Sequence, residues 1–239
     1  MSTSSREQLM LTRYHRYLDE LHAIARAIPV AEARLELTME VEAVREVAFP
    51  QPSWKAILLK TLSILQASCR DARIARVSRR SVEHDSFDIA VPMQRDSFQI
   101  FALMANPHRL ALSEIDEQLE RLGQTPLESL NGVRHLMHIA RYPGIISKIL
   151  SRVPIHWSIN KRVRYFGTAA IASSEEELTL SAFRPTLAYS FEGDRLKLRL
   201  CYDSRVMNSQ RAEHCLKMIG EILNQQIVFE LQYLRRLAA

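Results

Sequence analysis

The stretch between residues 195 and 223 constrains the fold more than any other part of the chain. In RLKLRLCYD apolar side chains alternate with mostly basic ones, which predicts a half-buried strand. The segment DSRVMNS follows as a turn, in which we expect Asp203 and Arg205 to be structural supports and Ser209 to cap the next helix. From about Gln210 one helix face is apolar, with Ala212, Cys215, Leu216, Ile219 and Leu223. We therefore expect a strand that turns directly into an amphipathic helix.

Length and composition set the outer limits. The 239 residues suffice for one large α/β domain or two small ones, and the hydrophobic fraction of 47% and charged fraction of 25% are those of a soluble globular protein. Cys69, Cys201 and Cys215 have neither zinc-site nor disulfide-framework spacing, which favours a reducing cytoplasm. The polar N-terminus has no signal-peptide core, and no run approaches the roughly 20 apolar residues of a spanning helix, so we expect no transmembrane segment.

The middle of the chain is basic. The net charge is +5, and no Asp or Glu occurs between Ser129 and Ser174. Two interpretations stay open: a solvated face of basic helices, or a docking surface for an acyl carrier protein, for the phosphates of coenzyme A or for anionic lipid headgroups. We expect no nucleic-acid partner, because no stacking platform interleaves with the basic positions. The residues that we assign to binding are Arg152, Lys161, Arg162 and Arg164.

Periodicity predicts the remaining elements. Helices are expected over residues 9–28, 42–47, 53–73 with Ser53 as N-cap, 110–124 with Ser113 as N-cap, 127–140 and 145–153. Strands are expected over residues 34–41, 74–80, 85–94, 96–105, 164–173, 185–192 and 195–203. The two strands that meet at Arg95 and Asp96 have the pattern of a hairpin.

The tail from Tyr202 to Ser209 resembles YDHRVxDG, the strand end that precedes a helix in the 2-oxoacid dehydrogenase acyltransferases and in chloramphenicol acetyltransferase. IARAIPVAEARLELTMEV is similar to the helix and first long strand of that family, and YFGTAAIASS to its GTFTISN segment. The resemblance covers nearly the whole chain. It implies a chloramphenicol acetyltransferase-like α/β fold, with a mixed sheet flanked by helices, over a single domain of residues 1–239 without lipoyl or subunit-binding domains. It also implies a homotrimer with clefts between protomers, formed by the segment around Ser204 of one chain and the segment around Ala172 of another.

The catalytic positions of this family are occupied by other residue types. The resemblance places Ser204 where the family has its general-base His, Asn208 where it has Asp, and Ser209 where it has Gly. An ungapped comparison with GTFTIS places Ala172 at the oxyanion-stabilising Ser, with Ser173 one step further as a possible substitute. A general base contributes about 10²–10⁴ in rate and one oxyanion donor about 10²–10³. A serine hydroxyl is no useful base at neutral pH without a partner.

The sequence therefore predicts a catalytically degenerate acyltransferase-like protein. We expect an accessory or scaffold subunit that binds an acyl carrier or a partner enzyme in a biosynthetic pathway. The alternative is an active acyltransferase that uses acyl-CoA or acyl carrier protein thioesters with a substituted base. A relocated histidine could supply that base, and the sequence names no favourite.

No metal site and no tightly bound cofactor are expected. His135 and His138 lie at an i, i+3 spacing, but no third ligand accompanies them. The resemblance implies that coenzyme A, or the phosphopantetheine of a carrier protein, would present the acyl group.

Overall fold

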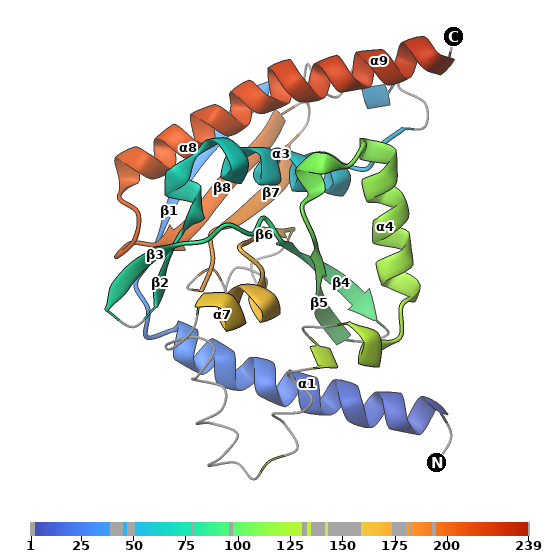
Figure 1. Ribbon diagram of the computed structural model, residues 1–239, viewed down its shortest axis with the longest axis vertical. Coiled ribbons are helices and arrows are strands. Elements are labelled where there is room, and N and C mark those ends of the chain that lie inside the picture. Colours follow the sequence, from blue (N-terminus) through green and yellow to red (C-terminus); the bar gives the residue numbers. More distant parts are fainter. Residues whose placement is uncertain are drawn as a thin grey trace.

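A six-stranded mixed sheet forms the centre of the computed structural model (Figure 1). The structure describes residues 3–38, 45–46, 51–77, 79–95, 98–130, 133–134, 142, 159–173, 181, 183–192 and 195–238. The strand order is β1-β8-β7-β6-β4-β5, and β2 and β3 form a separate two-stranded sheet. β6 runs parallel to both β4 and β7, whereas the other neighbours are antiparallel. The expected mixed sheet is confirmed.

The bounds of the elements are as follows. The helices are α1 (Thr3–Ala25), α3 (Trp54–Ser68), α4 (Leu112–Gln124), α7 (Ile159–Phe166), α8 (Ser209–Ile222) and α9 (Val228–Ala238), with a π-helical turn, Leu223–Ile227, joining the last two. The strands are β1 (Val30–Thr38), β2 (Ile74–Val77), β3 (Arg80–Glu83), β4 (Ile89–Arg95), β5 (Phe98–Met104), β6 (Ala169–Ala172), β7 (Thr186–Glu192) and β8 (Arg195–Asp203).

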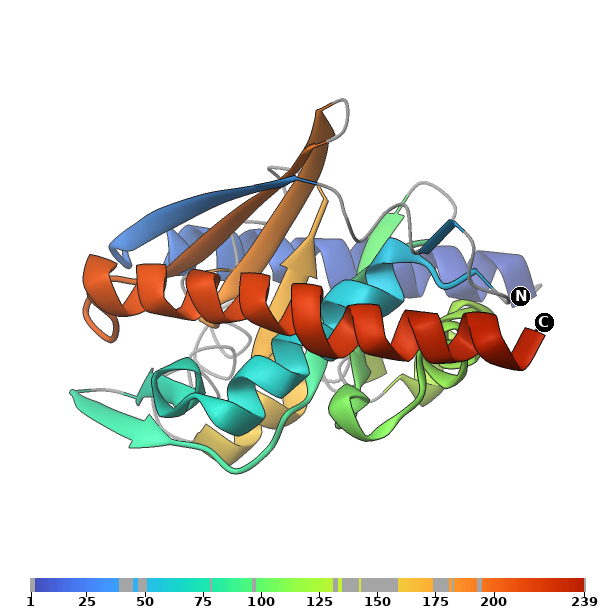
Figure 2. The ribbon, with the colours of Figure 1, turned by 90° about the horizontal axis from the view of Figure 1, so that it is seen from above.

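The main core lies between the sheet and the helices α3, α8 and α9. In Figure 2, α8 and α9 run along one side of the strands. Leu196, Leu198 and Leu200 of β8 belong to the same buried cluster as Leu216 and Ile219 of α8. The alternation of RLKLRL therefore places its leucines against helices, which is how an antiparallel strand with one solvated face is built.

A second core lies under α1. Leu11, Tyr14, Leu18 and Leu21 are buried together with residues of β5 and with Phe166 and Phe183. The Tyr14 hydroxyl accepts a hydrogen bond of 3.1 Å from the backbone N–H of Phe101 in β5. The N-terminal helix is thus fixed to the edge of the sheet opposite β1.

The sequence predictions hold for the C-terminal strand, turn and helix, and for the cap of α3. The Ser53 hydroxyl accepts a hydrogen bond of 3.1 Å from the N–H of Ala56. The predicted cap at Ser113 is wrong: α4 begins at Leu112, and the carboxylate of Glu114 accepts from the N–H of Ala111 at 2.7 Å.

The strand predicted over residues 164–173 begins too early. Residues 164–166 belong to α7, and only Ala169–Ala172 form β6. Gly167 separates the two with a φ of 73°, and a Cβ there would lie 2.6 Å from the carbonyl oxygen of Asp88. Only glycine makes this reversal and close approach without strain. Most of the helices predicted over 42–47, 127–140 and 145–153 lie outside the described residues.

In the part of the chain that the structure describes, no helix is both long and apolar enough to span a membrane.

Candidate functional site

The turn between β8 and α8 is held by Asp203 and Arg205. One carboxylate oxygen of Asp203 accepts from the backbone N–H of Arg205 at 3.0 Å and from its Nε at 2.9 Å. The other oxygen accepts from Nη2 at 2.7 Å. The pKa of Arg205 is raised, first by these hydrogen bonds to Asp203. A two-point contact of a carboxylate with a guanidinium fixes orientation as well as charge, so the pair supports the shape of the turn.

Ser204, which the resemblance aligns with the family's histidine, is exposed and hydrogen-bonded to the chain segment before β1. Its backbone N–H and its hydroxyl both donate to the carbonyl oxygen of Pro29, at 3.0 Å and 3.2 Å. Asn208 is the N-cap of α8, with its side-chain oxygen accepting from the N–H of Arg211 at 2.9 Å. The predicted cap at Ser209 is wrong, because Ser209 is already the first residue of the helix and the cap lies one residue earlier. Both side chains are used in backbone hydrogen bonds.

Ala172, which the resemblance aligns with the family's oxyanion serine, ends β6 and is fully buried. The strand register places it beside Ala188 of β7, which pairs with Arg199 of β8, which in turn pairs with Arg34 of β1. Ser204 lies five residues beyond Arg199, a separation of about 16 Å along an extended strand. A single chain therefore does not bring the two motif positions together.

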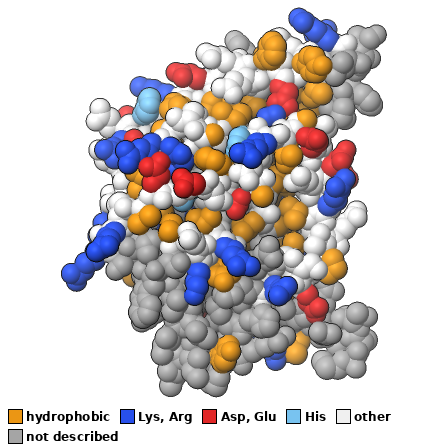
Figure 3. Space-filling model, in the orientation of Figure 1, with side chains coloured by type: hydrophobic (Ala, Val, Ile, Leu, Met, Phe, Trp, Pro, Cys, Tyr) orange, Lys and Arg blue, Asp and Glu red, His pale blue; other side chains and the backbone are white. Residues whose placement is uncertain are grey.

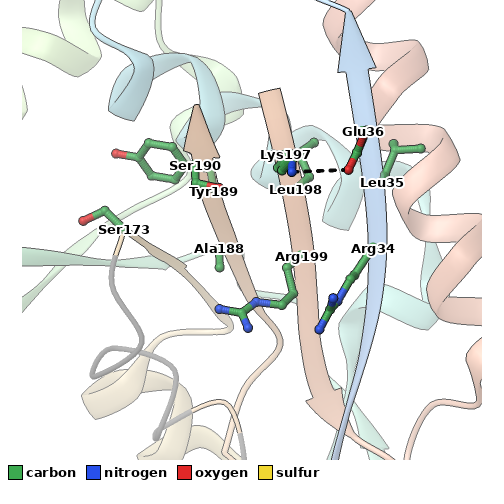
Figure 4. A pocket seen from close by; sticks show the side chains of 10 residues that line it. All are labelled: Arg34, Leu35, Glu36, Ser173, Ala188, Tyr189, Ser190, Lys197, Leu198 and Arg199. Atoms are coloured by element: carbon green, nitrogen blue, oxygen red, sulfur yellow. Dashed lines mark ion pairs between the residues drawn. The ribbon is translucent and has the colours of Figure 1, made fainter. Parts of the chain in front are cut away.

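A hollow of about 520 Å³ lies on the face of the sheet that carries this row. Arg34, Glu36, Lys197 and Arg199 line it together with Ser173 (Figure 4). Ser173 stands at its rim with the hydroxyl directed away from Arg199. Side chains here pair across strands: Lys197 lies 3.6 Å from Glu36, and Arg199 lies 3.5 Å from Glu32. No sequence motif pointed to this ladder, although its charges alternate with the core residues of both strands.

Two arginines are buried behind the turn. Arg162 of α7 is 5% exposed and Arg184, just before β7, is 4% exposed. Arg162 donates to the carbonyl oxygen of Arg76 at 2.5 Å, and Arg184 donates to that of Phe166. Burial lowers the pKa of Arg162 to about 10 and that of Arg184 to about 9. No pattern in the sequence pointed to Arg184.

Comparison with solved structures reveals the same arrangement of elements. A probable dihydrolipoamide acetyltransferase from Listeria monocytogenes superposes with a TM-score of 0.64 at 12% identity, covering 88% of this chain and 91% of that one. The dihydrolipoamide acetyltransferase of Azotobacter vinelandii gives 0.59 at 15% identity, covering 93% and 90%. A chloramphenicol acetyltransferase gives 0.50 at 11% identity, covering 85% and 94%.

The chain has the chloramphenicol acetyltransferase fold. The resemblance inferred from the YDSRVMNS tail is thus confirmed at the level of the fold. No family model matches the sequence, and no curated protein matches it.

Within the described part of the chain, no histidine lines the hollow. His84 lies in the loop before β4, where its Nδ1 is 3.0 Å from the carbonyl oxygen of Ser86, and burial lowers its pKa. The Nδ1 of His108 is 2.8 Å from the hydroxyl of Ser63. His135, His138 and His156 lie outside the described residues.

The four basic residues predicted to form a binding surface differ in their exposure. Lys161 and Arg164 are exposed on α7, whereas Arg152 lies outside the described residues. Arg162 differs from the expectation: its side chain is buried under α7 and cannot meet a partner at the surface. On the face drawn in Figure 3, basic side chains are interleaved with acidic ones in the upper half. No group of three or more metal-ligating side chains occurs among the described residues.

Proposed function

We propose that this protein is a catalytically degenerate acyltransferase homologue that binds an acyl carrier protein or a partner enzyme as an accessory or scaffold subunit. The observation that carries the proposal is Ser204. Its hydroxyl donates to the Pro29 carbonyl and meets no base among the described residues, so it has no means of taking a proton from a thiol. Ala172 offers no donor for an oxyanion.

The frame of the motif supports a binding role. Asp203, Arg205 and Asn208 keep the turn and the start of α8 in place. The Azotobacter structure was solved to examine a serine, a histidine and an asparagine in the catalytic mechanism of that enzyme, and its asparagine follows the histidine by four residues. Asn208 follows Ser204 at the same spacing, so it matches the asparagine of that enzyme and is not a sign of degeneracy. The shape around the reacting group is kept while the imidazole is replaced.

The experiment is an acyl-transfer assay with a panel of acyl thioesters and detection of free thiol. We expect no acceleration by the unmodified protein. The variant Ser204→His combined with Ala172→Ser restores both chemical groups and should give measurable thioester cleavage. Asn208→Ser, which keeps a helix cap and adds no base, is the matched control. Robust transfer by the unmodified protein would overturn degeneracy and establish the alternative, an active acyltransferase with a substituted base.

Assembly as a homotrimer is part of the proposal. The separation between the Ala172 row and Ser204 means that a complete cleft needs a second copy. The uncovered charged face of β1, β8 and β7 offers a surface for such a contact. Light scattering should give about 83 kDa, three times the chain mass of 27.5 kDa. A monomer at micromolar concentration contradicts this part of the proposal alone.

Carrier binding is tested separately through α7. Lys161→Glu and Arg164→Glu reverse two exposed charges and should weaken the binding of a purified phosphopantetheinylated carrier protein, with the difference shrinking as salt is added. The exposed Arg236→Glu on α9 is the charge-matched control. Equal affinities of all three variants at low salt would exclude this surface.

A further inference from the structure

Two of the three cysteines are in contact, although 146 residues separate them in the chain. The Sγ atoms of Cys69 and Cys215 lie 3.9 Å apart, and both residues are free thiols. Cys69 follows the last residue of α3, and Cys215 lies in the middle of α8. Both belong to the buried cluster that these helices share with the sheet. The contact therefore exists only because α3 and α8 pack together.

Little movement separates the two thiols from a disulfide. A disulfide bond is about 2.05 Å long, so the two sulfur atoms have to approach each other by about 2 Å. A cysteine side chain has a single χ angle, and a change of its rotamer moves the sulfur atom by a distance of this order while the backbone stays in place. Closure of the pair therefore requires rotation of side chains and no rearrangement of the two helices.

The surroundings give the two thiols different parts in an oxidation. Cys69 is 7% exposed and lies between the exposed residues Ser68 and Arg70, so a small oxidant reaches it first. Cys215 is fully buried, and burial raises the pKa of its thiol to about 12, with the neighbouring Cys69 adding to the effect. Because the thiolate is the reactive form, the protonated Cys215 is the poorer first nucleophile. Cys69 should react first and Cys215 second.

We propose that a peroxide oxidises Cys69 and Cys215 to a disulfide that locks α8 onto the end of α3. The thiolate of Cys69 attacks one oxygen of hydrogen peroxide, so a sulfur–oxygen bond forms and the oxygen–oxygen bond breaks. The leaving hydroxide takes up the proton that Cys69 has lost. The sulfur of Cys215 then attacks the sulfenic acid of Cys69, and its proton leaves with the hydroxyl group as water. Two thiols and one hydrogen peroxide thus give one disulfide and two waters.

The effect of the bond is on α8. The bond closes a loop across 146 residues, and restraining so long a loop in the unfolded chain stabilises the fold. Because α8 begins directly after the turn that carries Ser204, the lock holds the half of the helix that is next to this turn. The inference depends neither on acyl transfer nor on the oligomeric state.

Oxidation of the reduced full-length protein tests the proposal. Stoichiometric hydrogen peroxide is added, the remaining thiols are alkylated under denaturing conditions, and intact mass and peptide mapping identify the product. We expect a single chain that has lost two hydrogen atoms, is alkylated at Cys201 alone and has Cys69 joined to Cys215. Its thermal midpoint should lie about 5 °C or more above that of the reduced protein. Dithiothreitol should reverse both changes.

Variants assign the bond to this pair. Cys69→Ala and Cys215→Ala should each leave no disulfide within the chain and no rise of the thermal midpoint on oxidation. Cys201→Ala also removes a buried thiol and is the matched control, which should close as the unmodified protein does. Should Cys215→Ala fail to fold, peptide mapping of the unmodified protein still identifies the bonded cysteines.

Three results would overturn the proposal. One is the persistence of all three thiols in excess peroxide. Another is a product in which Cys69 carries a sulfinic acid, or in which the disulfide includes Cys201 or joins two chains. The third is a bond between Cys69 and Cys215 that leaves the thermal midpoint unchanged, since such a bond would not lock α8.

Discussion

The two faces of β8 differ as sharply as neighbouring residues can. Leu196, Leu198 and Leu200 are at most 2% exposed against α8, whereas the side chains of Lys197 and Arg199 between them are 40% and 27% exposed. Both faces belong to one strand, and successive side chains point alternately to the helices and to the open side. The covered face stabilises the fold, while the open face is free to serve an interface. Four predictions test this division.

The largest effect is expected on the covered face. Leu198→Ala removes buried methyl groups from the cluster shared with α8 and should lower the free energy of unfolding by about 3 kcal/mol. Urea unfolding followed by circular dichroism measures it. Lys197→Ala, one residue away on the open face, is the matched control and should leave the transition midpoint in place. Similar losses of stability in both variants would show that the two faces of β8 contribute equally to the fold.

The end of β8 breaks the rule, because Asp203 belongs to the open-face row and is nevertheless only 8% exposed. Asp203→Ala leaves Arg205 without its partner and removes the favourable charge beside Arg162, so we expect a loss of about 2 kcal/mol, reduced by the exposure of Arg205. Asp203→Asn should retain part of this stability through its side-chain oxygen. Denaturant unfolding of the three proteins in parallel measures both losses. If Asp203→Ala is as stable as the unmodified protein, the pair of Asp203 and Arg205 does not stabilise the fold.

A smaller effect is expected where the strand passes into α8. Asn208→Ala removes the N-cap hydrogen bond to Arg211 and should cost about 1 kcal/mol. Asn208→Ser, which can cap equally well, should cost little. Thermal unfolding compares the two, and equal losses would show that the side-chain oxygen does not contribute.

The smallest effect belongs to the open face. The hydrogen bond from Lys197 lowers the pKa of Glu192, so this carboxylate gives up its proton more readily in the folded than in the unfolded chain. Its contribution to stability is therefore present above the ordinary value of 4.5 and is lost as the pH falls through the lower folded pKa.

Because both groups are solvent-exposed, the effect on stability should be slight. A carbon-detected NMR titration should place the pKa of Glu192 higher in Lys197→Met than in the unmodified protein, with the gap closing in high salt. An identical pKa of Glu192 in the two proteins would show that Lys197 does not lower it.

Much of the fold was predictable from local patterns. The alternation in RLKLRLCYD, the apolar spacing of α8 and the cap at Ser53 each depend on residues close in the chain. Local patterns failed where a distant contact decides. The helix that contains Arg164 to Phe166 ends where Gly167 reverses the chain against Asp88, and no residue within the segment indicates that close approach.

In the candidate site, too, local patterns indicated some residues and missed others. The sequence located Ser204, Asn208 and Ala172, because a motif is a property of neighbouring residues. It assigned Arg162 to the surface, since a basic residue in a basic segment is normally solvated, and it passed over Arg184.

By itself the sequence determined the order of the elements, the strand, turn and helix at the C-terminal end, and the place of Ser204 in the YDSRVMNS tail. Only the tertiary structure decided that Arg162 and Arg184 are both buried, and that Ala172 and Ser204 lie far apart in one chain. The physical reason is that periodicity records which face of an element is apolar, whereas burial of a charge and the distance between two strand positions depend on which distant segments pack together.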